Sequence, residues 1–174
     1  MSTYVQSTFA WTTTEVVSTE STADALGNSI SIDASGNVHI AWDDFTDYDG
    51  AGIDQDIFYK RWNTSTSLWT TTEVVSTESA GLSFEPSLGT DFAGNVHITW
   101  IDTSDYAGAG TDGDIFYKRW NATTSTWTTT EFVSTESIYW TNHAFLVVDS
   151  AGNVHLAWND ATDYASAGTD EDIF

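Results

Sequence analysis

The sequence predicts an all-β repeat protein, and three observations carry this prediction. WTTTEVVSTES begins at Trp11 and again at Trp69, and WTTTEFVSTES begins at Trp127, so the chain repeats every 58 residues. The units are rich in Thr, Val, Ile and Trp, which favour strands. No stretch holds the 3.6-residue apolar period of an amphipathic helix. The 174 residues therefore form one domain of three units, 1–58, 59–116 and 117–174.

Each unit reads as four short strands in a fixed order. The first is TTTEVVS, and the second is the apolar stretch around Ile30 and Ile32. A D-x-x-G-N turn starting at Asp33 follows, with chemistry that suits a hairpin. NVHIAW is the third strand, and DIFYKRWN is the fourth, after an acidic loop that contains glycine.

The strands carry bulky residues on both faces. In NVHIAW, Val38, Ile40 and Trp42 share one face, and His39 and Ala41 share the other. Such strands suit sheets packed face to face, as the blades of a β-propeller are. The rival architecture, a parallel β-solenoid, has coils much shorter than 58 residues. We therefore expect a β-propeller with three four-stranded blades per chain.

The repeated D-x-x-G-N-V-H-x-x-W, followed by D-I-F-Y-K-R-W, resembles the repeat of sialidase-like β-propellers of the BNR/Asp-box type. The resemblance implies the propeller fold. The stricter Asp-box S-x-D-x-G-x-T-W is not met, because His39, His97 and His155 stand where that pattern prefers Thr. A sialidase site implies three arginines that grip a carboxylate, whereas Arg61 and Arg119 are the only arginines here. We therefore expect no enzymatic activity.

Three blades are too few for a closed ring, because propellers have at least about four. Three would leave two unpaired sheet edges. We expect a homodimer that completes six blades, with a nine-bladed homotrimer as the alternative. The chain ends at Phe174 within DIFYKRWN, and Met1 matches Tyr59 in phase, so residues 1–4 of a neighbouring copy could continue that strand. The other interpretation is a piece of a longer array.

Composition excludes several classes of partner. The chain has 4 Lys and Arg against 26 Asp and Glu, a net charge of −22, which repels nucleic acid and anionic membranes. It has no cysteine, which excludes disulfides and cysteine–zinc sites. The first residues lack the pattern of a signal peptide. N-x-[ST] motifs at Asn63 and Asn121 favour a secreted or cell-surface parent protein, but the sequence does not determine localisation.

The acidic loop between the third and fourth strands is a candidate calcium site. Four aspartates recur in each copy, and Ca²⁺ takes six to eight oxygen ligands on a flexible loop. The twelve candidate ligands are Asp44, Asp47, Asp54, Asp56, Asp102, Asp105, Asp112, Asp114, Asp160, Asp163, Asp170 and Asp172. The alternative is an acidic, solvated hairpin that keeps the protein soluble. We expect no required cofactor, with Ca²⁺ as the candidate ion.

The units differ most in one block, which begins at Thr22, Ala80 and Ile138 and includes the second strand. A propeller places this strand innermost, beside the central funnel. In the third unit the block carries an aromatic and polar cluster that could stack on a sugar ring or hold a peptide. Its members are Tyr139, Trp140, Asn142 and His143. The alternative is that the block varies because packing constrains it little.

The leading functional hypothesis is a non-catalytic binding or scaffold module that self-assembles into a closed ring and holds a glycan or peptide. Two alternatives remain open at this point. One is a relic of a sialidase-like enzyme that processes glycans. The other is an artificial repeat array, made to study propeller assembly, with no function of its own.

Overall fold

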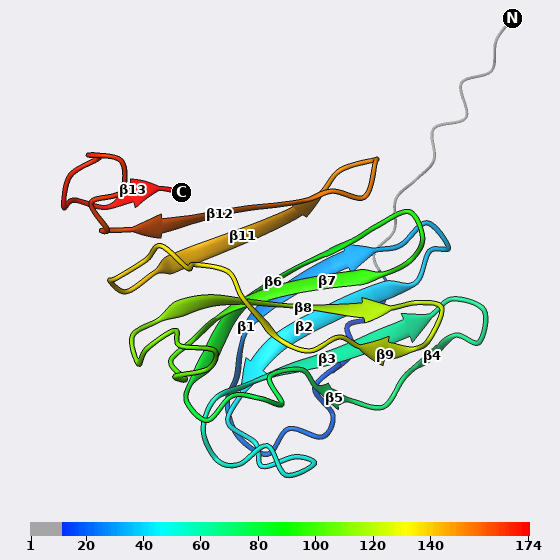
Figure 1. Ribbon diagram of the computed structural model, residues 1–174. Coiled ribbons are helices and arrows are strands. Elements are labelled where there is room, and N and C mark those ends of the chain that lie inside the picture. Colours follow the sequence, from blue (N-terminus) through cyan, green and yellow to red (C-terminus); the bar gives the residue numbers. More distant parts are fainter. Residues whose placement is uncertain (1–11) are drawn as a thin grey trace, which may run out of the picture.

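The computed structural model describes residues 12–174, which form three antiparallel β-sheets and no helix. Figure 1 shows the second sheet between the first and the third. The first sheet contains β1 (Ala25–Ile32), β2 (Val38–Asp44), β3 (Asp56–Asn63), β4 (Leu68–Trp69) and β5 (Glu73–Val74). The second contains β6 (Ser83–Thr90), β7 (Val96–Asp102), β8 (Asp114–Asn121), β9 (Thr126–Trp127) and β10 (Glu131–Phe132). The third contains β11 (Asn142–Val148), β12 (Val154–Asp160) and β13 (Asp172–Ile173).

Each sheet is offset from the sequence unit. The outer position beside β3 is taken by β4 and β5, which belong to the following copy of WTTTEVVS, and β9 and β10 lie beside β8 in the same way. The segment predicted as the first strand of its own unit therefore completes the preceding sheet. In the part of the chain that the structure describes, two sheets have this outer strand and the third has three strands. The expected continuation through residues 1–4 lies outside the described residues.

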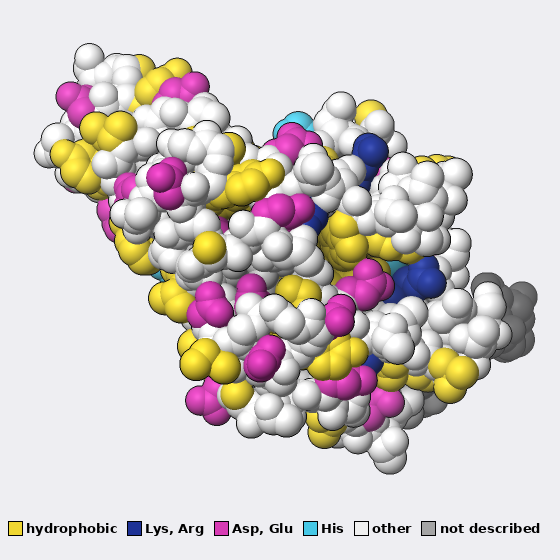
Figure 2. All heavy atoms as spheres, turned by 60° about the horizontal axis from the view of Figure 1, so that its bottom comes forward, with side chains coloured by type: hydrophobic (Ala, Val, Ile, Leu, Met, Phe, Trp, Pro, Cys, Tyr) yellow, Lys and Arg dark blue, Asp and Glu magenta, His cyan; other side chains and the backbone are white. Residues whose placement is uncertain are grey.

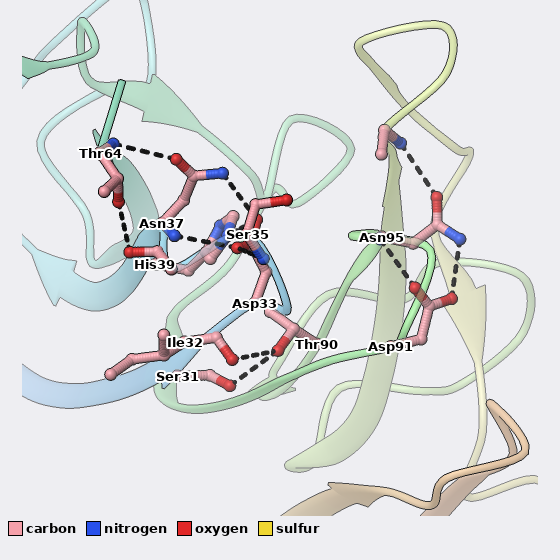
Figure 3. Close-up of polar contacts among 12 residues, drawn as sticks. Ser31, Ile32, Asp33, Ser35, Asn37, His39, Thr64, Thr90, Asp91 and Asn95 are labelled. Atoms are coloured by element: carbon pink, nitrogen blue, oxygen red, sulfur yellow. Dashed lines mark hydrogen bonds and ion pairs between the residues drawn. The ribbon is translucent and has the colours of Figure 1, made fainter. Parts of the chain in front are cut away.

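The D-x-x-G-N turn forms as the sequence predicted, held by its aspartate (Figure 3). Asp33 accepts hydrogen bonds from the backbone N–H of Ser35 and Asn37, each at 2.9 Å, and from Asn37 Nδ2 at 2.8 Å. Asn37 Oδ1 in turn accepts from the N–H of Thr64, at 3.0 Å, and so joins two adjacent loops. Gly36 has a φ of 82°, which glycine adopts without steric cost. The motif is thus a structural device for the hairpin.

Two of the three repeated histidines are buried inside their own sheets, whereas His155 in the third sheet is exposed. His39 is buried, with Nδ1 2.7 Å from the hydroxyl of Tyr59 and Nε2 3.3 Å from Asp33 Oδ2. His97 makes the same two contacts in the second sheet. Both contacts of each of these histidines lie within a single sheet. His39 thus links its turn to β3, and His97 links its turn to β8.

Two buried lysines, one in the first sheet and one in the second, join their sheets to the connections that enter them. Lys118 Nζ donates to Val75 O at 2.9 Å, to Thr77 Oγ1 at 2.8 Å and to Glu78 Oε2 at 2.6 Å. Lys60 makes the equivalent contacts in the first sheet, with Glu20 Oε2 at 2.8 Å. Because each ammonium group has three donors, these contacts satisfy it fully. The lysines are therefore structural.

The sheets meet at seams in which a small side chain faces an apolar one. Ser29 Oγ accepts from the N–H of Leu88 at 3.0 Å, and Ser87 Oγ accepts from the N–H of Leu146 at 2.9 Å. A Cβ at Gly89 would lie only 2.9 Å from Leu146 Cδ2, so this position has no room for a larger residue. Such seams place β1, β6 and β11 side by side.

Candidate functional site

A hollow of about 290 Å³ lies where β1, β6 and β11 meet. Three residues from each strand line it: Gly27, Asn28 and Ser29; Glu85, Pro86 and Ser87; His143, Ala144 and Phe145. These belong to the block in which the three units differ most. The hollow is therefore surrounded by three chemically different surfaces at equivalent positions of the repeat.

A β-bulge in each strand shapes the hollow. The pairing register shifts between Leu26 and Ser29 in β1, and at the equivalent places in β6 and β11. The first bulge residue has a left-handed backbone in all three strands, with φ of 37° at Gly27, 52° at Glu85 and 51° at His143. This conformation costs a residue with a side chain about 1–2 kcal/mol. Strain of this kind is common at binding sites, so it marks Glu85 and His143 as functional candidates.

Asp43 supports the bulge of the neighbouring sheet. Its Oδ1 accepts from the N–H of Glu85 at 3.1 Å, and its Oδ2 accepts from Gln55 Nε2 at 2.5 Å. Burial raises the pKa of this carboxyl group, and the two hydrogen bonds partly oppose that change. A Cβ at Gly27 would collide with Asp43 Oδ1, so glycine is required there. Asp43 therefore positions the backbone of Glu85, and both carboxylate oxygens of Asp43 accept hydrogen bonds from the protein.

The structure separates the four ligand residues that the sequence predicted. His143 lines the hollow, and Asn142 begins β11 opposite Asn159. Trp140 is half-buried in the seam, where its ring stacks on Phe84 with centroids 6.2 Å apart. Tyr139 is half-exposed on the loop before β11. Only His143 thus reaches the hollow.

Asn28, Glu85 and Phe145 also line the hollow and were not predicted from the sequence. The available signal was that positions 27, 85 and 143 carry Gly, Glu and His within otherwise similar units. The bulge that turns these positions toward one hollow leaves no mark in the apolar alternation of the strand.

The twelve aspartates of the acidic loops divide into groups with different surroundings. Asp44, Asp102 and Asp160 end β2, β7 and β12, directly opposite Asp56, Asp114 and Asp172 on the next strand. Asp47, Asp105 and Asp163 accept the N–H of Gly52, Gly110 and Gly168 within their own loops. Asp54, Asp112 and Asp170 stand two residues before the paired strand aspartates. Among residues 12–174, no three acidic or histidine side chains are grouped so that they could hold a metal ion.

Two of the strand aspartates have unusual protonation. Burial raises the pKa of Asp56 to about 6, although the hydroxyl of Ser76 donates to its Oδ1 at 2.6 Å. Asp114 has the same raised pKa, about 6, with Ser134 as donor at 2.7 Å. In each, Oδ2 is buried without a hydrogen-bond partner. These groups take up protons in mildly acidic solution.

Acidic side chains are spread widely over the surface seen in Figure 2, with few basic ones among them. This distribution agrees with the net charge of −22. Any ligand that approaches this protein meets a negative field, which disfavours phosphates, sulfates and carboxylates.

Comparison with known proteins identifies the fold and no family. No family model matches the chain, and no curated protein matches it. Among solved structures, it is similar to an endo-arabinase from Bacteroides thetaiotaomicron VPI-5482, with a TM-score of 0.54 and 15% identity over 87% of this chain. The match covers 55% of the endo-arabinase, so the chain spans about half the length of that enzyme.

A fucose lectin from Kordia zhangzhouensis, solved with methyl-fucoside, has a TM-score of 0.47 and 14% identity, over 85% of this chain and 97% of the lectin. Together with the three sheets, the similarity to the endo-arabinase agrees with an all-β, propeller-like fold. The resemblance to sialidase-like propellers accordingly stays at the level of the fold.

Proposed function

We propose that the chain is a non-catalytic β-propeller module that binds a neutral glycan in the hollow between β1, β6 and β11. The observation that carries the proposal is the convergence of three bulges there, two of which hold Glu85 and His143 in a strained backbone. Strain at two equivalent positions is a cost that a purely structural strand would avoid with glycine, as the first unit does at Gly27.

The lining suits a sugar. Asn28, Ser29, Glu85, Ser87 and His143 offer both donors and acceptors, which hydroxyl groups can match in either sense. The ring of Pro86 supplies apolar surface on which a sugar ring can lie. The volume is at the lower end of the range of about 300–1,000 Å³ for small-molecule sites. The hollow therefore suits a single sugar unit.

The surroundings favour binding over catalysis. Glycoside hydrolysis commonly uses two carboxyl groups free to exchange protons with the substrate. Asp43, the carboxyl group beside Glu85, has both oxygens occupied by donors of the protein itself. A relic of a sialidase-like enzyme would also need clustered arginines, whereas Arg61 lies over the ring of Trp120, 5.1 Å from its centroid, in a seam.

A screen of neutral and acidic glycans on an array, followed by calorimetry of the hits, tests this function. We expect neutral hits whose affinity falls at least tenfold in Glu85→Ala and in His143→Ala. Phe92→Ala, on an exposed turn away from the hollow, serves as the matched control. Hits that are unaffected by both substitutions, or a peptide ligand in place of a glycan, would contradict the proposal.

A second function, scaffolding through self-assembly, is favoured by the apolar sheet faces that are exposed at both ends of the described part of the chain, residues 12–174. We propose that two copies complete a six-bladed ring, with a nine-bladed trimer as the alternative. Since propellers typically have four to eight blades, the dimer is the better fit. Neither function requires a cofactor.

A further inference from the structure

The internal seams follow one chemical rule. The strand on one side presents small side chains, Ser29 and Ser31 in β1, and the facing strand presents larger ones, led by Leu88 in β6. Ser31 Oγ also meets Thr90 Oγ1 at 3.1 Å across the seam (Figure 3). Between β6 and β11 the same positions carry Ser87 and Gly89, facing Leu146 and Val148.

The two open faces are the two halves of such a seam. Ile30 occupies the position of Leu88 and Leu146, yet it is 62% exposed, against 6% and 5% for those residues. At the other end of the molecule, Phe145 and Val147 occupy the small-residue positions and are 68% and 62% exposed. One half thus lies on the first sheet and the complementary half on the third.

We propose that Phe145 and Val147 of one copy pack against Ile30 and Ile32 of a second copy, head to tail. This inference rests on the self-assembly proposed above and identifies the surfaces that perform it. A second copy is the expected partner because of continuity with the internal seams. If the series of sheets continued, the next strand to pack against β11 would present a face like that of β1. Two such contacts, related by a two-fold axis, close a ring of six sheets.

The first sheet has a hollow that can receive the aromatic ring. An apolar hollow of about 270 Å³ lies on its open face, lined by Val17, Leu26, Ile30, Ile40 and Trp42, among others. Its volume exceeds that of a phenylalanine side chain. Phe145 is the large exposed aromatic residue of the face that would meet it. The protruding ring of Phe145 on the third sheet and the hollow on the first sheet are therefore complementary surfaces of the same molecule.

The intermolecular seam differs from the internal ones in a way that gives it specificity. Phe145 cannot accept the backbone N–H that Ser29 and Ser87 accept, so this seam is apolar. A Cβ at position 89 would lie 2.9 Å from Leu146 Cδ2, whereas the equivalent position carries Val147, which requires a wider spacing. The intermolecular seam therefore has larger residues than the internal seams, Phe145 and Val147 on one face and Ile30 and Ile32 on the other. These two faces fit each other better than they fit the internal faces, which disfavours incorrect pairing of sheets.

Two single substitutions, each on a different face, test the proposal by light scattering at micromolar concentration. We expect the natural sequence to have about twice the chain mass of 19.1 kDa, and Ile30→Asp and Val147→Asp each to be monomeric. Ile53→Asp, at an exposed position in the acidic loop, should remain dimeric. Near-ultraviolet circular dichroism would verify that each variant is folded.

A charge-pair variant completes the test. In Ile30→Lys combined with Val147→Asp, opposite charges would meet in both seams, and we expect the dimer to return. A monomeric natural sequence would overturn both self-assembly and this inference. A dimer that survives both aspartate substitutions would overturn the inference alone. Loss of the dimer in only one of them would show contact between like faces, and would also overturn it.

Discussion

Glu85 and His143 adopt the left-handed backbone conformation that glycine, Gly27, adopts at the equivalent position of the first unit. Because glycine adopts a left-handed conformation without a steric penalty, Glu85→Gly should raise the free energy of unfolding by about 0.5–1 kcal/mol. The same substitution should remove glycan binding, since it deletes a side chain of the hollow. Urea unfolding and calorimetry would measure the two effects, and a loss of stability would contradict the role assigned to the bulge.

The raised pKa values of Asp56 and Asp114 make stability depend on pH. Because the folded state holds these protons more tightly than the unfolded state, their contribution is present below about pH 4 and lost as pH rises through about 6. The change from 3.8 to about 6 corresponds to about 3 kcal/mol per group. The contribution of these two groups to stability should therefore fall between pH 4.5 and pH 7.5, whereas burial lowers the pKa of His39 and His97 and gives a contribution of the opposite sign.

Asp56→Asn should flatten this profile and stabilise the protein at pH 7.5, because the amide is neutral at every pH. Asp49→Asn, in the loop between β2 and β3, is the control. Below pH 4 the opposite trend takes over, because the hydrogen bond from Lys60 chiefly lowers the pKa of Glu20 to about 2. A pH profile of the melting temperature that is the same in Asp56→Asn as in the natural sequence would contradict the assignment.

At the scale of elements, the seam between β6 and β11 depends on the absence of a side chain at Gly89. A Cβ there would lie 2.9 Å from Leu146 Cδ2 and 3.0 Å from Val148 Cγ2, closer than van der Waals contact allows. Gly89→Ala should destabilise slightly, because the ends of those side chains can move. Gly89→Val should cost about 1–3 kcal/mol. Thermal unfolding of the series measures the trend, and equal stability of all three would contradict it.

The sequence predicted the strands better than their partners. The D-x-x-G-N turn and the strands that flank it were recognisable because their residues act locally. TTTEVVS was predicted as one strand, whereas only Glu73–Val74 and Glu131–Phe132 form short strands within it, and residues 12–18 form none. Its pairing with the preceding sheet is a long-range choice that composition does not encode. The bulges were missed for a related reason, since the register shift between Phe84 and Ser87 depends on the facing strand.

The candidate site was predictable only in part. The variable block identified His143, because chemical differences among near-identical units stand out. It also selected Trp140, whose ring instead fills the seam beside Phe84. An aromatic residue in a connecting segment can serve either purpose, and the side-chain packing of the neighbouring sheet decides between them.

For the molecule as a whole, a net charge of −22 governs the response to ions. We expect the melting temperature in millimolar calcium to equal that in chelator at matched ionic strength. The physical reason is that loop aspartates such as Asp47 accept N–H groups of their own loops, and residues 12–174 contain no group of three ligands. Sodium and magnesium chloride are the controls for charge screening. Stabilisation by calcium alone would instead favour a specific site.

The offset between unit and sheet gives mechanical unravelling a direction. Peeling the chain from its C-terminal end removes β11 to β13 first and then β9 and β10, which strips the outer strand from the second sheet. Peeling from the N-terminal end removes β1 to β3 and leaves the second sheet with all of its strands. A molecule pulled from its two ends should therefore unfold asymmetrically. Unfolding that starts at the C-terminal end should propagate into the next sheet more readily than unfolding that starts at the N-terminal end.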